Sequence, residues 1–121
     1  MAGLEIKSLD APDERRTMAD KGDVLVYNVG GHAVLGGTWN PGWRWSEHVK
    51  PIAGTSSCEA THLIHLQSGR MHVVMDDGTE GEIGPGDVAY IGPGHDAWVV
   101  GDEPCVGLDF GGSAQYGTRP G

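Results

Sequence analysis

Apolar and polar residues alternate along most of this chain in short runs, and most runs end at a glycine, proline or aspartate. Alternation of this kind places successive side chains on opposite faces of a β-strand, and the breaks are typical of tight turns. Asp77-Gly78 is the clearest hairpin signal, because these residues tolerate the positive φ that such turns need. The predicted strands cover residues 24–29, 32–39, 43–50, 60–67, 70–75, 80–83, 88–91, 97–100 and 105–110.

Many short strands separated by turns indicate an all-β sandwich or barrel. A chain of 121 residues is long enough to bury one core and too short for two. The 21 glycines and 7 prolines lie between the apolar runs and form no low-complexity block, as a succession of tight turns requires. We therefore expect one domain at residues 23–110, with a meandering N-terminal arm at 1–22 and a C-terminal tail at 111–121.

The charge distribution argues against several kinds of partner. The formal net charge is −9, and the 8 lysines and arginines form no run or stripe, so neither nucleic acid nor an anionic membrane is expected to bind. The pattern predicts no signal peptide and contains no apolar stretch of the roughly 18 residues that a membrane span needs. A cytoplasmic protein is expected, in which Cys58 and Cys105 are free thiols.

The middle of the chain carries two motifs that resemble those of cupins. In the first cupin motif, a Pro-Gly pair is followed after five residues by a histidine, and a later acidic position is followed by a glycine at the seventh residue. Here Pro41-Gly42 leads to His48, and Gly69 is the seventh residue after His62. The spacing within each half of the first motif is thus preserved.

The second cupin motif has a Gly-Asp pair, a short strand and a glycine-containing turn. Gly86-Asp87, residues 88–91 and Gly92-Pro93-Gly94 match it. Over residues 24–110 the chain therefore resembles a small single-domain cupin. That resemblance implies a jelly-roll β-barrel and a homodimer in which N-terminal strands pack between subunits.

The residues that bind metal in cupins are only partly present. His48 stands at the position of the first histidine, and Lys50 replaces the second. His62 occupies the position of the glutamate, while Ala97 replaces the last histidine and His95 lies two residues before it. Only His48 carries over from the motif unchanged.

Three histidines at predicted strand ends still suggest a metal site. The neutral imidazoles of His48, His62 and His95 would leave room for water or substrate and would suit Zn, Fe, Ni, Mn or Cu. Cys58, in the loop before His62, is a candidate for a fourth, softer ligand. The alternative is that these histidines only form hydrogen bonds in a polar interior.

Cations and aromatic residues near His48 are candidates for contact with a substrate. Alternation places Arg44 and Lys50 on the same face of the predicted strand as His48. Either could act catalytically by orienting a substrate carboxylate, and Lys50 could also donate a proton. The alternative is that the strand ends before Lys50, which then reaches solvent. The remaining candidates for the substrate pocket are Trp45, Cys58, Tyr90 and Trp98.

Three hypotheses of function follow. The first is a metal-dependent enzyme, of lyase, isomerase or oxygenase type, that acts on a small polar or acidic metabolite. The second is a barrel that binds or senses a metabolite without metal or catalysis, and the third is a dimeric interaction domain. Loss of metal in His48→Ala or His62→Ala would support the first. Thermal stabilisation by a metabolite without metal would support the second, and a dimer weakened by Trp43→Ala the third.

Overall fold

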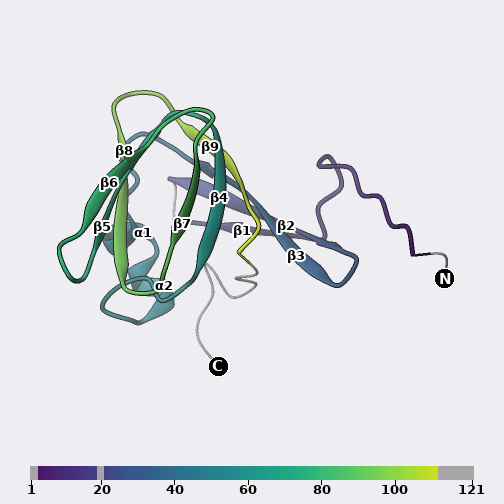
Figure 1. Ribbon diagram of the computed structural model, residues 1–121, viewed down its shortest axis with the longest axis horizontal. Helices are drawn as coiled ribbons and strands as arrows, with labels where there is room; N and C mark the ends of the chain where they lie inside the picture. Colours follow the sequence, from purple (N-terminus) through teal and green to yellow (C-terminus); the bar gives the residue numbers. More distant parts are fainter. Residues whose placement is uncertain (1–2, 19–20, 112–121) are drawn as a thin grey trace.

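The computed structural model describes residues 3–18 and 21–111. Its strands are β1 (Glu14–Thr17), β2 (Gly22–Val29), β3 (His32–Trp39), β4 (His62–Ser68), β5 (Arg70–Met75), β6 (Glu80–Ile83), β7 (Val88–Ile91), β8 (His95–Val100) and β9 (Cys105–Asp109). They form a six-stranded sheet, in the order β1-β2-β3-β9-β4-β7, and a three-stranded sheet, in the order β6-β5-β8 (Figure 1). Every pairing between these strands is antiparallel.

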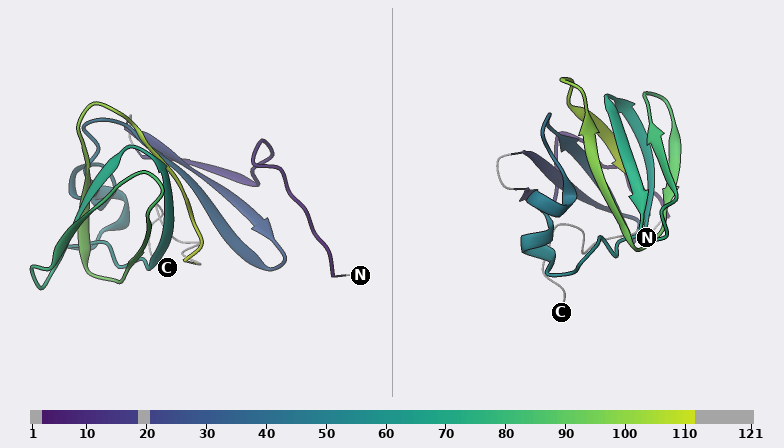
Figure 2. Two further views of the ribbon diagram at one scale, coloured as in Figure 1. Left: turned by 45° about the horizontal axis from the view of Figure 1, so that its top comes forward. Right: turned by 90° about the vertical axis from the view of Figure 1, so that its left-hand side faces the viewer.

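The predicted all-β jelly-roll fold is confirmed, with one difference in its closure. The two sheets face each other and are not joined into a single ring of hydrogen-bonded strands (Figure 2). Within the described residues, β1 and β7 end the larger sheet, and β6 and β8 end the smaller. The fold is therefore a cupin-like β-sandwich and not a closed barrel.

The hairpin between β2 and β3 shows how the turn residues set the strand register. Gly30 and Gly31 have φ angles of 57° and 81°, a conformation that costs glycine little and other residues much. Positive φ at both central residues matches the twist of the two strands, and Val29 pairs directly with His32. The turn thereby aligns the whole length of the two strands.

Residues 43–50 do not form the strand that the alternation predicts. The structure has two short helices there, α1 (Trp45–His48) and α2 (Lys50–Ala53). Trp45 and Val49 are both buried, and side chains four residues apart share one face of a helix. A proline in the first turn of α2 and a left-handed Gly54 (φ 76°) at its C-cap fix its ends.

The two ends of the chain were predicted to lack regular structure. In the predicted arm at 1–22, however, β1 pairs with β2 and extends the larger sheet. Most of the predicted tail, residues 112–121, lies outside the described residues. No helix in the described part of the chain is long and apolar enough to cross a membrane.

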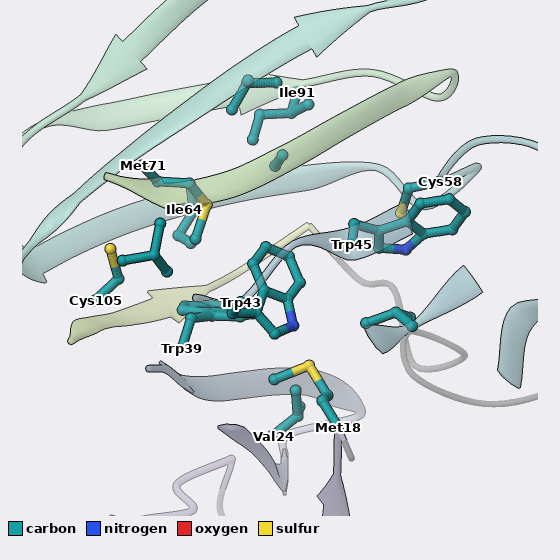
Figure 3. Close-up of a cluster of buried hydrophobic side chains, with 14 of the residues drawn as sticks. Met18, Val24, Trp39, Trp43, Trp45, Cys58, Ile64, Met71, Ile91 and Cys105 are labelled. Carbon is teal, nitrogen blue, oxygen red and sulfur yellow. The ribbon is translucent and has the colours of Figure 1, made fainter. Parts of the chain in front are cut away.

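The core lies between the two sheets and is centred on tryptophans. Trp39, Trp43 and Trp45 are each at most 5% exposed. In Figure 3 Trp39 and Trp43 lie between Met71 on one side and Met18 on the other. The rings of Trp39 and Trp43 meet edge to face, with centroids 6.1 Å apart, an arrangement that aromatic pairs favour. One wall of the interior is therefore built from indole rings.

Candidate metal centre

Cys58, His62 and His95 meet in the buried interior. One potential ligand atom from each of them lies within 4.8 Å of the other two. Cys58 Sγ is 3.8 Å from His62 Nε2, and the two imidazole centroids are 5.2 Å apart. A thiolate and two imidazoles at these separations are the donor types found in zinc and other transition-metal sites.

Different segments bring the three residues together. His62 is the first residue of β4 and His95 the first of β8. Because their rings are in contact, the two strands, which belong to different sheets, begin side by side. Cys58 lies in the preceding loop, where its N–H donates to the carbonyl of His95 (2.8 Å) and its carbonyl accepts from Gly94 N–H (2.7 Å). This backbone bridge fixes the loop against the start of β8.

Each histidine is oriented by an acceptor at Nδ1. His95 Nδ1 donates to the backbone carbonyl of Gly92 at 2.7 Å, and because a carbonyl can only accept, Nδ1 carries the proton. His62 Nδ1 forms a short contact with the carboxylate of Asp109. In both rings the lone pair then lies on Nε2, the nitrogen that binds metal in histidines held by a second group at Nδ1.

Asp109 is itself held in place by the backbone. Its Oδ1 accepts hydrogen bonds from the N–H groups of Leu63 (3.1 Å) and Gly111 (2.9 Å), while Oδ2 faces His62. Burial alone would raise the pKa of Asp109, but the hydrogen bond to His62 and these backbone donors lower it below its usual value. Asp109 is therefore an ionised carboxylate behind His62.

Burial keeps His95 and Cys58 uncharged in the metal-free protein. Loss of solvent lowers the pKa of His95, so its ring stays neutral. Burial also raises the pKa of the Cys58 thiol to about 12. A metal reverses the second effect, because a coordinated thiol loses its proton.

A small cavity adjoins the cluster. Its volume is about 20 Å³, enough for roughly one water molecule. His62 and His95 form part of its wall, and the other lining residues are Trp39, Trp43, Trp45, Ile64, Met71, Ile91 and Ala97. Apart from the two histidines, none of these lining residues of the described structure is ionisable.

The structure does not bring His48 to this cluster. Its ring lies on α1, where Nδ1 is 3.0 Å from the backbone nitrogen of Arg44 and 3.1 Å from its carbonyl oxygen. Helical turns at 45–53 replace the predicted strand, so the alternation that would aim His48 inward does not apply. Lys50 begins α2 and is exposed.

Three other candidates lie on outer surfaces. The guanidinium of Arg44 is 4.2 Å from the ring centre of Trp98, which stacks on His72 at 4.8 Å. Because side chains alternate along β8, Trp98 lies opposite to the buried His95 and Ala97. Tyr90 on β7 is 71% exposed. Of the pocket residues that the sequence suggests, Trp45 lines the cavity and Cys58 belongs to the cluster.

Parity explains how His95 enters the site, and it also gives the signal for Asp109. The cupin motif has its histidine at the position of Ala97, and His95 two residues earlier points to the same side of the strand. Asp109 was not among the predicted residues. Its signal was a carboxylate in an apolar run, 105–110, at a position whose parity with Cys105 and Gly107 directs it inward.

Comparisons with known proteins support the fold. No model of a known protein family and no curated protein sequence matches the chain. Among solved structures, a protein of unknown function from Vibrio parahaemolyticus has a TM-score of 0.60 at 16% identity, covering 83% of this chain and 98% of that one. A protein of unknown function from Acidithiobacillus ferrooxidans has a TM-score of 0.58 at 18% identity, covering 80% and 85%.

A mutant of Bacillus subtilis oxalate decarboxylase is also similar. Its TM-score is 0.56 at 20% identity, and the match covers 84% of this chain and 28% of the enzyme. Identities this low establish a shared fold and no shared activity. The chain is a cupin-like β-sandwich protein with a buried Cys-His-His cluster that could hold a metal.

Proposed function

We propose that the chain is a metal-dependent protein that holds one transition-metal ion through Cys58, His62 and His95. The observation that carries the proposal is the convergence of three buried ligand atoms, with both imidazoles already oriented by acceptors at Nδ1. Buried polar groups are costly unless they are hydrogen-bonded or bind a ligand, and here the bonds at Nδ1 leave Nε2 of both rings facing the cluster. Cys58 thus takes the place that the sequence assigned to His48.

The donor set narrows the choice of metal. Thiolate and imidazole favour Zn, Fe, Co, Ni or Cu, whereas Mg, Ca and Mn prefer oxygen donors. Three protein ligands leave a coordination position for water or substrate, which is characteristic of catalytic sites. The cavity beside His62 and His95 is the space into which that position would open.

The cavity walls also bear on the type of reaction. Lyases and isomerases commonly move protons through a side chain in contact with the substrate. Among the described lining residues, the two histidines are metal ligands in this proposal and the others are apolar or indole groups. We therefore favour an oxygenase-type reaction on a small molecule, in which the metal supplies redox chemistry and the walls exclude water and position the substrate.

A second candidate is a non-catalytic metal-binding or sensing protein. The observation that favours it is the size of the cavity, about 20 Å³, which admits roughly a water-sized ligand. A metabolite could bind only if the tryptophan wall moved. Under this candidate the protein would bind metal and a small ligand without turnover.

The test begins with elemental analysis of the untagged protein after exposure to Zn, Fe, Co, Ni and Cu. We expect about one metal per chain, lost in Cys58→Ser, His62→Ala and His95→Ala. His48→Ala is the matched control, because His48 is a histidine outside the cluster. Loss of metal in His48→Ala together with retention in His95→Ala would refute the proposed ligand set.

A second measurement separates the two candidates. The iron-loaded protein is incubated with a panel of small molecules, and dioxygen uptake is followed. Uptake that depends on one substrate and is absent from His62→Ala supports the oxygenase. Ligand-induced thermal stabilisation of the loaded protein without uptake supports the sensing protein.

A further inference from the structure

The groups around the cluster carry a definite charge. Asp109 accepts hydrogen bonds from the N–H groups of Leu63 and Gly111 and faces His62 Nδ1, and these surrounding donors favour its ionised form. Cys58 would bind as a thiolate, and the two histidines would bind as neutral imidazoles. The Cys58 thiolate and the Asp109 carboxylate therefore contribute two negative charges, which balance the two positive charges of one divalent ion.

The surroundings offer no cation to balance a further negative charge among the described residues. Arg44 is stacked on Trp98, which does not line the cavity, and its Nε lies 4.0 Å from the Asp96 carboxylate. Lys50 is exposed on α2. Two further carboxylates lie nearby and add to the negative charge that an anion would meet: Asp76 accepts from Ser57 Oγ (2.9 Å) and Asp96 from Ser46 N–H (3.1 Å). An anion in the cavity would have only indole and aliphatic neighbours besides the metal.

We propose that this centre binds a divalent ion as an electrically neutral unit, and that its open position takes a small uncharged ligand and rejects anions. The inference rests on the proposed metal site and adds the class of ligand. An anion would bring an unbalanced charge into an apolar cavity, which is costly. A neutral ligand of two or three heavy atoms requires little rearrangement of the wall. Of the polar or acidic metabolites that the sequence suggests, this class admits only uncharged ones.

The experiment compares two ligands of one shape and different charge. Azide and acetonitrile are both linear, have three heavy atoms and bind through nitrogen, but only azide is an anion. Each is titrated into the Co²⁺-loaded protein while the visible absorption of the cobalt is recorded. For each protein, the dissociation constant of azide is divided by that of acetonitrile. The two ligands differ in intrinsic donor strength, but this difference is the same in every protein and cancels when the ratios of two proteins are compared.

The comparison protein is Asp109→Asn, which removes one negative charge behind His62. We expect the azide-to-acetonitrile ratio to fall at least about tenfold in this variant, because the centre then has a net positive charge. An unchanged ratio would overturn the charge balance. Exclusion of both azide and acetonitrile from both proteins would show that shape alone limits access, and would overturn it as well.

The titration of the wild-type protein also tests the inference if the variant does not bind cobalt. The amide introduced by Asp109→Asn cannot accept from three donors as the carboxylate does, so the variant could lose its metal. In that case the wild-type titration decides: azide binding below about 1 mM refutes the inference, and acetonitrile binding without any azide response supports it. Cobalt content is measured first, so that a chain without metal counts against the proposed function and not against the ligand class.

Discussion

The metal-site cluster and the N-terminal segment 3–12 differ in what holds them in place. In the cluster, His62 and His95 are each at most 7% exposed and each has a fixed hydrogen-bond acceptor. In the segment, Leu4 and Ile6 are 74% and 84% exposed, and Figure 1 shows the chain there extending away from the sheets.

The contacts of the N-terminal segment are mainly polar. The hydroxyl of Tyr27 donates to the carbonyl of Leu9 (2.7 Å), and Lys7 forms an ion pair with Asp13. Exposed ion pairs contribute little to stability. Burial with directional bonds therefore fixes the geometry of the cluster, whereas the apolar side chains of the segment lack a surface to cover them within the described chain.

The largest effect should come from removing a ligand. Cys58→Ser and His62→Ala should each weaken metal binding by at least about a thousandfold, since a transition-metal site of three protein ligands depends on every one of them. A competition assay with a chromogenic chelator measures the affinity. His48→Ala should bind within about twofold of the wild-type protein; an equal loss there would mean that the cluster is not the site.

The next effect concerns the carboxylate behind His62. Asp109→Ala should weaken metal binding by about 10–100-fold, because it frees the ring that the carboxylate orients. It also leaves the N–H groups of Leu63 and Gly111 without their acceptor, which should lower the free energy of unfolding by about 1–3 kcal/mol. Chelator competition measures the metal affinity, and urea denaturation measures the free energy of unfolding. A stable variant with wild-type affinity would contradict this role for Asp109.

Packing beside the tryptophan wall should have a smaller effect, on stability alone. A Cβ at Gly37 would lie 2.1 Å from the buried ring of Trp39, so Gly37→Ala should destabilise the protein by about 1–3 kcal/mol. Gly81→Ala is the matched control in β6, because nothing lies within 4 Å of a Cβ built there. Thermal unfolding compares the two, and equal midpoints would refute the packing argument.

The smallest effect on the monomer should come from the N-terminal segment. Ile6→Ser should change the free energy of unfolding by less than about 0.5 kcal/mol and leave metal binding unchanged. The homodimer implied by the cupin resemblance remains a prediction, and sedimentation equilibrium of Ile6→Ser beside the wild-type protein tests it. Weaker association in the variant would place the segment at the interface, whereas identical behaviour would remove it from that role.

The alternation of apolar and polar residues correctly predicted most strands of the sandwich, but at residues 43–50 it predicted a strand where the structure has helices. In β5, β7 and β9 the residues predicted to alternate do so, because one face of each strand covers a core. At 43–50 two buried residues, Trp43 and Trp45, imitate a strand. Val49 shows the helical spacing, and a short window of sequence cannot separate the two periods.

The candidate site was predicted in part for a similar reason. His62 and His95 stand at strand starts, and local parity directs both inward. Cys58 was recognised as a thiol near His62, but its place depends on the bridge to His95, a residue far from it in the sequence. Asp109 and His62 are 47 positions apart in the sequence, and no local sequence pattern predicts that they are in contact.

By itself the sequence determined most strands and turns outside residues 43–50, and which side chains of those strands point inward, because these depend on the two-residue period of a strand and on glycine at positive φ. Only the tertiary structure decided that Cys58 and Asp109 would join two histidines, and that residues 45–53 would form helical turns that leave His48 and Lys50 outside the cluster. These outcomes depend on how separate strands pair and pack. The energies that select them come from burial and from hydrogen bonds between segments distant in the sequence.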